Sequence, residues 1–312
     1  MKVVFFGSGD FAISSLEAIT GSGHKVLTVV TQPDRKGGRH LKLTPPPVKV
    51  AASLANIAVY QPELASESAS IEHLKALGAD VFVVVSFGQI LSAELLKVPR
   101  KCSINLHGSL LPRYRGAAPV NYAIINGDKK SGVTVIKMSP QMDAGEMILH
   151  AETDIKGIDT SISLGERLAD IGAKLVVESL DLIEQDKAAF TAQDEKAVSY
   201  APKLKKSDGL IDWKKPANAV RNLARGLQPW PGAYTHLDGK MLKIYNAEVV
   251  DRPASGEFKP GQIVEVVREE GIIVKAGKMC LFVKSLQIEG KRIVDAAAFL
   301  RGHKLKPGAT LS

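Results

Sequence analysis

Cysteine is scarce in this chain of 312 residues, which contains only Cys102 and Cys280. Without a CxxC motif or a cluster of cysteine and histidine, the sequence predicts neither a disulfide framework nor a structural zinc site. The histidines other than His107 show no metal-ligand spacing either, so we expect no bound metal. A low cysteine content is typical of proteins in a reducing compartment, and we expect a cytoplasmic location.

Long apolar runs are missing as well. No segment approaches the ~18 apolar residues that a membrane span requires, and the apolar run near the start is interrupted at Gly7, which is too early for a signal peptide. Internal repeats and low-complexity tracts are also absent. The length, with 45% hydrophobic residues, allows a full core and about two domains.

Positive charge is concentrated in the last third of the chain. Residues 203–312 contain 20 lysines and arginines against 11 aspartates and glutamates, a net charge of +9, whereas the first 202 residues carry −1. This asymmetry favours a polyanionic partner, and nucleic acid before a membrane, because no basic amphipathic helix is evident. A basic surface that serves solubility alone is the alternative interpretation.

Strands and helices alternate over residues 1–190. The VFVVV run at residues 81–85 is typical of a central parallel strand that is buried on both faces. A long amphipathic helix is predicted over residues 161–185. Further strands are predicted at residues 2–6, 26–31, 132–138 and 147–150. We therefore expect an α/β fold whose first domain, residues 1–190, is a Rossmann-like and mainly parallel sheet.

The second domain has a different pattern. Amphipathic order is lost over residues 191–208, which we interpret as a linker. Residues 209–312 then show one helix, at residues 216–227, and several short β runs, with an Asp238–Gly239 pair that is typical of a tight hairpin. Short strands with little helix predict a small OB-like β-barrel, a fold that suits nucleic-acid binding.

Polar residues gather in the segment INLHGSLLPRYRGAAP, residues 104–119. Asn105 and His107 alternate with apolar residues, so on a strand both polar side chains point to one face. Gly108 ends this strand, and the basic loop after it leads to a helix predicted to begin at Ala118 or Pro119. Ligands of open α/β sheets bind at such carboxyl ends of strands.

This segment and the MDAG of residues 142–145 resemble the formyltransferase family that uses 10-formyltetrahydrofolate. TQPDRKGGR near the start and the basic last third extend the resemblance over nearly the whole chain, closest to members that formylate the methionine carried by initiator tRNA for translation initiation. The resemblance implies an enzyme that takes 10-formyltetrahydrofolate as cosubstrate and initiator methionyl-tRNA as acceptor. It also implies that Asn105, His107 and Asp143 are catalytic.

Formyl transfer to an amine needs the chemistry that these three side chains offer. An asparagine amide can donate a hydrogen bond to an oxyanion, and an imidazole moves protons near neutral pH. A carboxylate can hold the imidazole and take a proton from the attacking amine. Taken singly, each also has an ordinary structural interpretation. Asparagine and histidine on strands often only satisfy hydrogen bonds, and an aspartate before Ala-Gly often forms a turn.

The resemblance implies that two segments bind folate. One segment lies within residues 104–119, the signature of the family, and comprises Ser109, Leu110, Leu111 and Pro112. The other follows the strand at residues 81–85 and comprises Ser86, Phe87 and Gly88. The family usually has tyrosine where Phe87 stands, so this chain lacks a hydroxyl group at that position.

Two basic regions are candidates for tRNA contact. Residues 32–47 lack periodicity and predict a long irregular loop. A mobile solvated loop is one interpretation, whereas the resemblance implies that Arg39 carries the loop's contact with the acceptor stem. Lys205, Lys206, Lys214 and Lys215, at the entrance of the second domain, are our candidate phosphate contacts.

Other functions stay open at this stage. Gly7, Gly9 and Ala12 satisfy the GxGxxA dinucleotide pattern, but no ribose-binding acid ends the next strand, so these residues are interpreted as a tight turn. A formyltransferase with a small amine acceptor would use the same chemistry without needing a basic second domain. A non-catalytic RNA-binding protein with a Rossmann-like domain is the third possibility. We expect a monomer.

Overall fold

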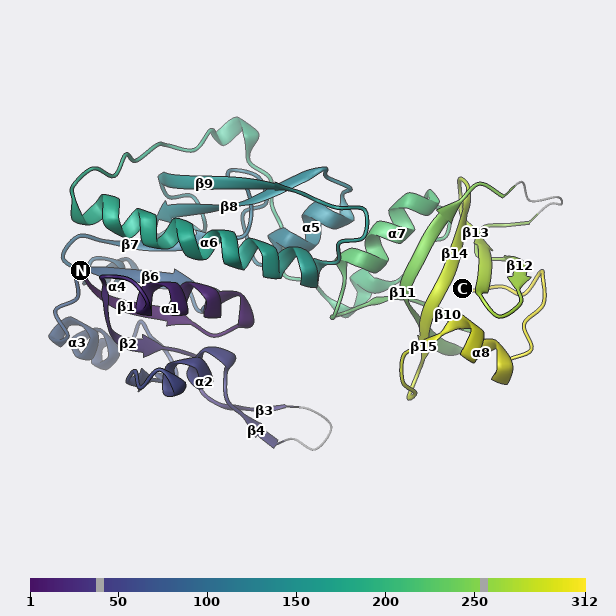
Figure 1. Cartoon of the computed structure of the whole chain (residues 1–312), viewed down its shortest axis with the longest axis horizontal. Coiled ribbons are helices and arrows are strands. Elements are labelled where there is room, and N and C mark those ends of the chain that lie inside the picture. Colours follow the sequence, from purple (N-terminus) through teal and green to yellow (C-terminus); the bar gives the residue numbers. More distant parts are fainter. Residues whose placement is uncertain (38–41, 253–257) are drawn as a thin grey trace. The chain divides into compact units, whose positions relative to one another are not determined.

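The computed structural model of the chain describes residues 1–37, 42–252 and 258–312 (Figure 1). These residues divide into two compact units. The first contains Met1–Pro119, Lys130–Asp154 and Gly165–Ala201, and the second contains Val120–Lys129, Ile155–Leu164 and Pro202–Ser312. Each unit is thus assembled from segments that are distant in the sequence.

The described part of the first unit holds a seven-stranded sheet in the order β5-β2-β1-β6-β7-β8-β9. Its strands are β1 (Lys2–Gly7), β2 (Lys25–Val30), β5 (Val59–Tyr60), β6 (Val81–Val85), β7 (Cys102–His107), β8 (Lys130–Lys137) and β9 (Met147–Asp154). Neighbours from β5 to β7 are parallel, whereas β8 is antiparallel to β7 and to β9. The mainly parallel α/β sheet that the sequence predicted is confirmed.

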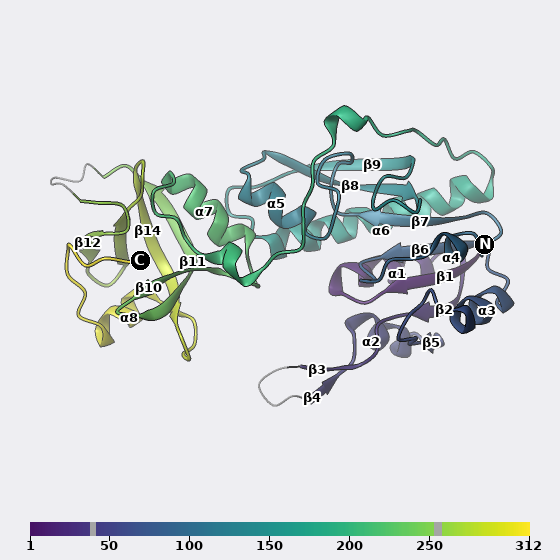
Figure 2. The same ribbon diagram turned by 180° about the vertical axis from the view of Figure 1, so that it is seen from behind.

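Helices cover this sheet on both faces (Figures 1 and 2). On one face, Phe6 and Phe82 share a buried cluster with Leu74 of α3 and Leu95 of α4. The opposite face carries α1 and the long α6. The helices of the first unit are α1 (Ile13–Thr20), α2 (Pro47–Leu54), α3 (Ser68–Ala76), α4 (Ala93–Leu96) and α6 (Ser161–Glu184) from Gly165 on. Apart from its first residue, α5 (Pro119–Ile125) belongs to the second unit. Every residue of β6 is buried, as a continuous apolar run between two helical layers requires.

The direction of the strand order reverses at β1. The chain moves from β1 through β2 to β5, and then returns to the other side of β1 with β6 and β7. Ligands of open α/β sheets bind outside the carboxyl ends of the strands at such a reversal. The backbone N–H of Ser8, after β1, donates to the carbonyl of Ser86, after β6, over 3.2 Å. The segments after β1, β6 and β7 are therefore placed to form a site.

The prediction of an irregular loop at residues 32–47 was wrong. β3 (Arg35–Gly37) and β4 (Lys42–Thr44) pair there as an antiparallel ribbon. Strands of three residues are too short to show a period in the sequence. Burial gives no signal either, because the described side chains of both strands are exposed and the pairing comes from the backbone. Arg39 lies outside the described residues.

The described part of the second unit contains an antiparallel sheet in the order β10-β11-β14-β13-β12, with β15 paired to β14. The strands are β10 (Ala233–Leu237), β11 (Lys240–Val250), β12 (Ile263–Val267), β13 (Gly271–Lys275), β14 (Cys280–Ile288) and β15 (Val294–Asp295). Two helices, α7 (Ala217–Gly226) and α8 (Ala296–Gly302), contribute buried residues to the same core. The short β15 and α8 were not anticipated from the sequence.

Residues 308–312 close this sheet into a barrel. The N–H of Ile263, in β12, donates to the carbonyl of Ala309 over 2.8 Å, and Ser312 exchanges backbone hydrogen bonds of 2.7 and 3.0 Å with His236 in β10. Because β10 and β12 are the outermost strands of the sheet order, this segment pairs with both open edges. The small β-barrel that the sequence predicted is confirmed.

The Asp-Gly hairpin is also confirmed. Leu237 pairs with Lys240, which leaves Asp238 and Gly239 as a two-residue loop with φ angles of +49° and +75°. Positive φ at both positions defines the hairpin turn whose twist matches that of the flanking strands. None of the helices within the described ranges is long and apolar enough to cross a membrane.

We expect Phe6→Ala to destabilise the first unit by about 3–5 kcal/mol, because a large side chain is removed from a filled core. Phe6 is fully buried, and its ring lies 5.1 Å from that of Phe82 and 5.4 Å from that of Phe87. Urea denaturation followed by circular dichroism measures the loss. Leu54→Ala is the control, because Leu54 is 81% exposed, and equal losses for both variants would contradict this description of the core.

Candidate active site

The segments after β1, β2 and β6 are joined by a small hydrogen-bond network. Ser8 Oγ donates to the carbonyl of Phe87 over 3.1 Å and accepts the backbone N–H of Gln32 at 3.1 Å. Gln32 Nε2 donates to the same carbonyl over 3.2 Å. Ser86 and Gly88 have φ angles of +47° and +86°, so the chain turns sharply after β6. The three predicted folate residues of this segment thus lie at the carboxyl edge of the sheet.

Phe87 faces the core instead of solvent. The whole residue is only 2% exposed, and its ring meets Phe6 edge-on. The ring therefore anchors the segment, while the Phe87 carbonyl accepts from Ser8 and Gln32. A tyrosine hydroxyl at this position would have needed a buried hydrogen-bond partner.

Asn105 lies on β7 in register with Val84 of β6 and Ile136 of β8. Its side chain is partly exposed. Among the residues that the structure describes, none forms a hydrogen bond with this side-chain amide. An amide on a rigid central strand, with its donors unused, is available to a ligand.

His107 ends the same strand and is 6% exposed. Its Nε2 lies 2.9 Å from the carbonyl oxygen of Tyr114, and its Nδ1 lies 3.6 Å from Oδ2 of Asp143. A carbonyl can only accept a hydrogen bond, so Nε2 donates to Tyr114. The other ring nitrogen, Nδ1, is thereby directed at the Asp143 carboxylate.

Asp143 lies in the turn between β8 and β9. Its φ angle is +51°, a left-handed conformation that aspartate tolerates better than most side chains. Oδ2 accepts the backbone N–H of Gly116 at 2.8 Å. Gly145 must be glycine for steric reasons, because a Cβ atom there would lie 1.7 Å from the carbonyl oxygen of Lys137. The MDAG turn thus holds the carboxylate close to the end of β7.

The remaining predicted folate residues form a loop tied to β8. Thr134 Oγ1 donates to the carbonyl of Ser109 over 2.7 Å and accepts the N–H of Leu111 at 3.1 Å. Ser109 Oγ donates to the carbonyl of Arg113 over 2.6 Å. Leu110 and Pro112 belong to the same loop, directly after His107. Sequence reasoning missed Thr134, which carries no motif signal.

Arg115 and Gln193 were also missed. Gln193 Nε2 donates to the carbonyls of Asp143 and Gly145, and its Oε1 accepts from the guanidinium of Arg115. Arg115 is 5% exposed and also pairs with Glu195 at 2.8 Å. The position of Arg115 inside the signature was a signal that could have been used. Gln193, by contrast, lies in a stretch without periodicity or motif.

Comparisons with known proteins cover both units. Residues 1–180 match the family described as formyl transferase, and residues 203–304 match the formyl transferase C-terminal domain. The chain belongs to the formyltransferase family.

Full-length relatives of this formyltransferase include the methionyl-tRNA formyltransferase of Moorella thermoacetica, 46% identical over 100% of this chain and 99% of that protein. The methionyl-tRNA formyltransferase of Citrifermentans bemidjiense is 44% identical over 100% of this chain and 96% of that protein.

Solved structures share the fold at low identity. WlaRD, a sugar 3N-formyl transferase solved with dTDP and 5-N-formyl-THF, is 19% identical with a TM-score of 0.67 and covers 94% of this chain and 99% of its own. HypX from Aquifex aeolicus in complex with tetrahydrofolic acid is 17% identical with a TM-score of 0.63 and covers 96% of this chain and 47% of its own.

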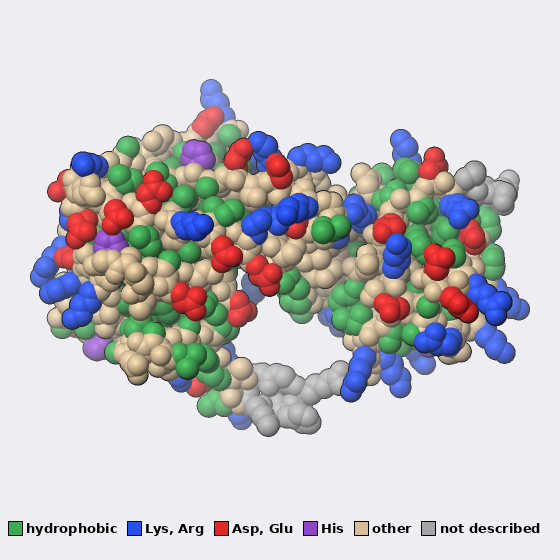
Figure 3. Space-filling model, in the orientation of Figure 1, with side chains coloured by type: hydrophobic (Ala, Val, Ile, Leu, Met, Phe, Trp, Pro, Cys, Tyr) green, Lys and Arg blue, Asp and Glu red, His purple; other side chains and the backbone are tan. Residues whose placement is uncertain are grey.

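The four candidate lysines of this formyltransferase are exposed on the second unit. Lys205 and Lys206 stand at the start of a 3-10 turn, and the N–H of Lys205 donates to Oδ2 of Asp208 over 2.7 Å. Lys214 and Lys215 precede α7. Figure 3 shows Lys and Arg side chains over the C-terminal unit, interspersed with acidic ones on the face drawn. The local contacts leave these ammonium groups available to a phosphate backbone.

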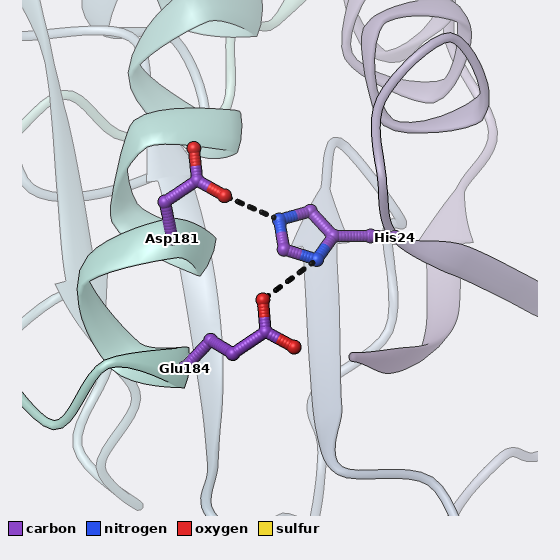
Figure 4. A group of neighbouring side chains, drawn as sticks. All are labelled: His24, Asp181 and Glu184. Atoms are coloured by element: carbon purple, nitrogen blue, oxygen red, sulfur yellow. Dashed lines mark ion pairs between the residues drawn. The ribbon is translucent and has the colours of Figure 1, made fainter.

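A second cluster of titratable groups lies away from this site (Figure 4). Buried His24 has Asp181 Oδ1 3.1 Å from Nε2 and Glu184 Oε2 3.9 Å from Nδ1. The Met1 amine approaches Nδ1 at 3.1 Å, and its hydrogen bond to Glu184 lowers the pKa of that carboxyl group. The two carboxylates lie on opposite ring nitrogens, and one ligand atom from each of the three residues lies within 4.8 Å of the others. Together with the Met1 amine, the cluster joins α6 to the residues that precede β1 and β2.

Proposed function

We propose that this formyltransferase transfers the formyl group of 10-formyltetrahydrofolate to the α-amino group of methionine on initiator methionyl-tRNA, for translation initiation. The observation that carries the proposal is the match of the whole chain, including its C-terminal domain, to methionyl-tRNA formyltransferases. The available Asn105 amide and the His107–Asp143 pair at the end of β7 supply groups suited to this chemistry.

In this proposal Asn105 stabilises the oxyanion. Attack of an amine on the formyl carbon converts the carbonyl oxygen into a negatively charged one. The amide of Asn105 donates to this oxygen without a change in its own charge. Because the residue stands on a strand between two neighbours, its donor is fixed before the reaction and little reorganisation is needed.

His107 and Asp143 carry the proton. The attacking amine loses a proton as its bond to the formyl carbon forms, and Nδ1 of His107 has the lone pair to accept it. The Asp143 carboxylate, 3.6 Å away, stabilises the imidazolium that results. When the bond between the formyl carbon and the folate nitrogen breaks, the imidazolium returns the proton to that nitrogen, and the ring is again neutral.

The folate cosubstrate supplies the activated formyl carbon. We propose that it binds at the carboxyl edge of the sheet, between the segment after β6 and the loop after β7. Both segments are fixed by hydrogen bonds, from the backbone N–H of Ser8 to the Ser86 carbonyl in one case and from the N–H of Leu111 to the Thr134 hydroxyl in the other. The proposed contacts are Ser86, Phe87, Gly88, Ser109, Leu110, Leu111 and Pro112.

The tRNA acceptor is the proposed ligand of the basic regions. We assign catalysis to residues 1–190, a linker to residues 191–208 and tRNA binding to the barrel of residues 209–312, which carries most of the net charge of +9 counted from residue 203. The proposed contacts are Arg39, Lys205, Lys206, Lys214 and Lys215. Lys and Arg groups that neutralise phosphates give an affinity that does not depend on sequence.

We further propose that the enzyme is a monomer in the cytoplasm. Cys102 and Cys280 are free and buried, and burial raises the pKa of both thiols, which keeps them unreactive. Free, unreactive thiols are typical of proteins in a reducing compartment such as the cytoplasm.

A turnover assay with three acceptors tests the function. We expect rapid formylation of charged initiator tRNA by 10-formyltetrahydrofolate, and no product with free methionine or with glycinamide ribonucleotide. Product formation with a small amine alone would support the alternative small-molecule enzyme, and the lack of product with all three would support a non-catalytic RNA-binding protein.

Alanine variants test the catalytic assignment. Asn105→Ala should lose about 2.7–4 kcal/mol of transition-state stabilisation, because one oxyanion donor is removed. His107→Ala should lose about 100- to 10,000-fold in kcat. Folate binding should persist in both, as measured by titration calorimetry. Asn246→Ala and His150→Ala, which change exposed residues, are matched controls, and near wild-type turnover in both active-site variants would refute the assignment.

Charge reversal tests the tRNA surface. Changing Lys205, Lys206, Lys214 and Lys215 to Glu should weaken tRNA binding at low salt and reduce the slope of log affinity against log salt, because fewer counterions are released. The value of kcat at saturating tRNA should stay close to that of the parent. Fluorescence titration at several salt concentrations measures both binding quantities.

The matched control reverses four exposed lysines of the first unit. It changes Lys25, Lys75, Lys97 and Lys187 to Glu. Because the net charge changes equally in both variants, a similar loss of affinity in each would show a general charge effect and remove the four candidate lysines from the proposal.

A further inference from the structure

Gln193 links the two loops that hold the His107–Asp143 pair. Its Nε2 donates to the carbonyl oxygens of Asp143 and Gly145, each over 2.8 Å. Its Oε1 accepts from Nε and Nη2 of Arg115 at 3.0 and 2.8 Å. A glutamine amide has two N–H donors and two acceptor lone pairs. All four are used, so the side chain is fixed at both ends.

The Arg115 end of this link leads back to the same carboxylate. Arg115 is buried and immediately precedes Gly116, whose N–H donates to Oδ2 of Asp143 over 2.8 Å. Its backbone also pairs with the carbonyl of Ser199 and the N–H of Ala201, both at 2.8 Å. Gln193 therefore contacts the Asp143 turn directly and supports, through Arg115, the loop that hydrogen bonds to the Asp143 side chain.

The Asp143 turn needs such support. A non-glycine residue at a φ of +51° is in a sparsely populated conformation, which persists only where surrounding contacts hold it. The Gln193 amide satisfies the carbonyls on both sides of Ala144, within the turn itself. The carboxylate also lies 3.6 Å from Nδ1 of His107, a separation that a small shift of the turn would increase.

We infer that Gln193 is a positioning residue, which holds the Asp143 carboxylate beside His107, where it stabilises the imidazolium formed during proton transfer. The inference rests on the proposed function, in which this pair carries the proton. Gln193 acts through Asp143 and requires no contact with either substrate. Its loss should therefore lower kcat by about 10- to 100-fold, as expected for a small misplacement of a catalytic group, without changing the KM for 10-formyltetrahydrofolate.

Two variants separate this role from simple satisfaction of Arg115. Gln193→Met preserves the approximate size of the side chain and removes all four hydrogen bonds. Gln193→Glu keeps an acceptor for Arg115 but has no N–H groups for the carbonyls of Asp143 and Gly145. Positioning predicts a loss of kcat in both variants. A role limited to Arg115 predicts that the Glu variant is active, and that result would overturn the inference.

The assay uses the full chain with 10-formyltetrahydrofolate and charged initiator tRNA. Circular dichroism and folate titration report whether each variant folds. Gln185→Met is the matched control, because it makes the same chemical change at an exposed glutamine, and it should keep the parental kcat. Parental kcat in folded Gln193→Met would also overturn the inference.

A double-mutant cycle with Asp143→Asn distinguishes positioning through Asp143 from general structural damage. If Gln193 acts through the Asp143 carboxylate, Gln193→Met should cost little further kcat in the Asp143→Asn background. The same fold loss in both backgrounds would overturn the inference.

The cycle also separates the inference from the function on which it rests. A fully active Asp143→Asn would overturn the proposed proton-transfer role of the pair. An inactive Asp143→Asn beside a fully active Gln193→Met would overturn the positioning role alone.

Discussion

Parallel pairing of β6 with β1 and β7 is the constraint on which the candidate site depends. All five residues of β6 are buried, and burying each Val or Phe stabilises the fold by roughly 1.5–3 kcal/mol. The favourable position of β6 is therefore in the middle of the sheet, between two helical layers. Parallel neighbours necessarily align their carboxyl ends. The segments that hold Ser8, Ser86 and His107 therefore meet at one edge of the sheet, although they are far apart in the sequence. Apolar burial thus determines where the chemistry is possible.

Hydrogen bonds then determine the geometry within that edge. Each contributes only about 0.5–1.5 kcal/mol net, so the polar network around Asp143 adds little to stability compared with the core. It selects one arrangement instead, because the carbonyl of Tyr114 orients the imidazole of His107 and the N–H of Gly116 orients the Asp143 carboxylate. This arrangement also buries the charged side chain of Arg115. A buried guanidinium is tolerated only with partners, which Gln193 and Glu195 provide.

In the second unit the constraint is a short antiparallel sheet with two open edges. Backbone hydrogen bonds of the segment at residues 308–312 cover both edges, with β10 on one side and β12 on the other. Its core is apolar, with Trp213, Val220 and Leu281 among the buried residues, so the excess of lysine and arginine is left to the surface. This arrangement keeps packing and charge separate, and a basic surface can bind a polyanion without disturbing the fold.

The sequence by itself determined the elements whose signal is local. The buried run of β6, the amphipathic α6 and the Asp238–Gly239 turn follow from periodicity and turn chemistry within a few residues, and the signature identified the family. Only the tertiary structure decided the contacts between distant residues. Gly116 meets Asp143 across 27 positions, and Gln193 meets Asp143 across 50. The β3–β4 ribbon also appeared only in the structure, because backbone pairing of exposed three-residue strands leaves no pattern in side chains. Such contacts depend on how the sheet brings loops together, which no local pattern of residues encodes.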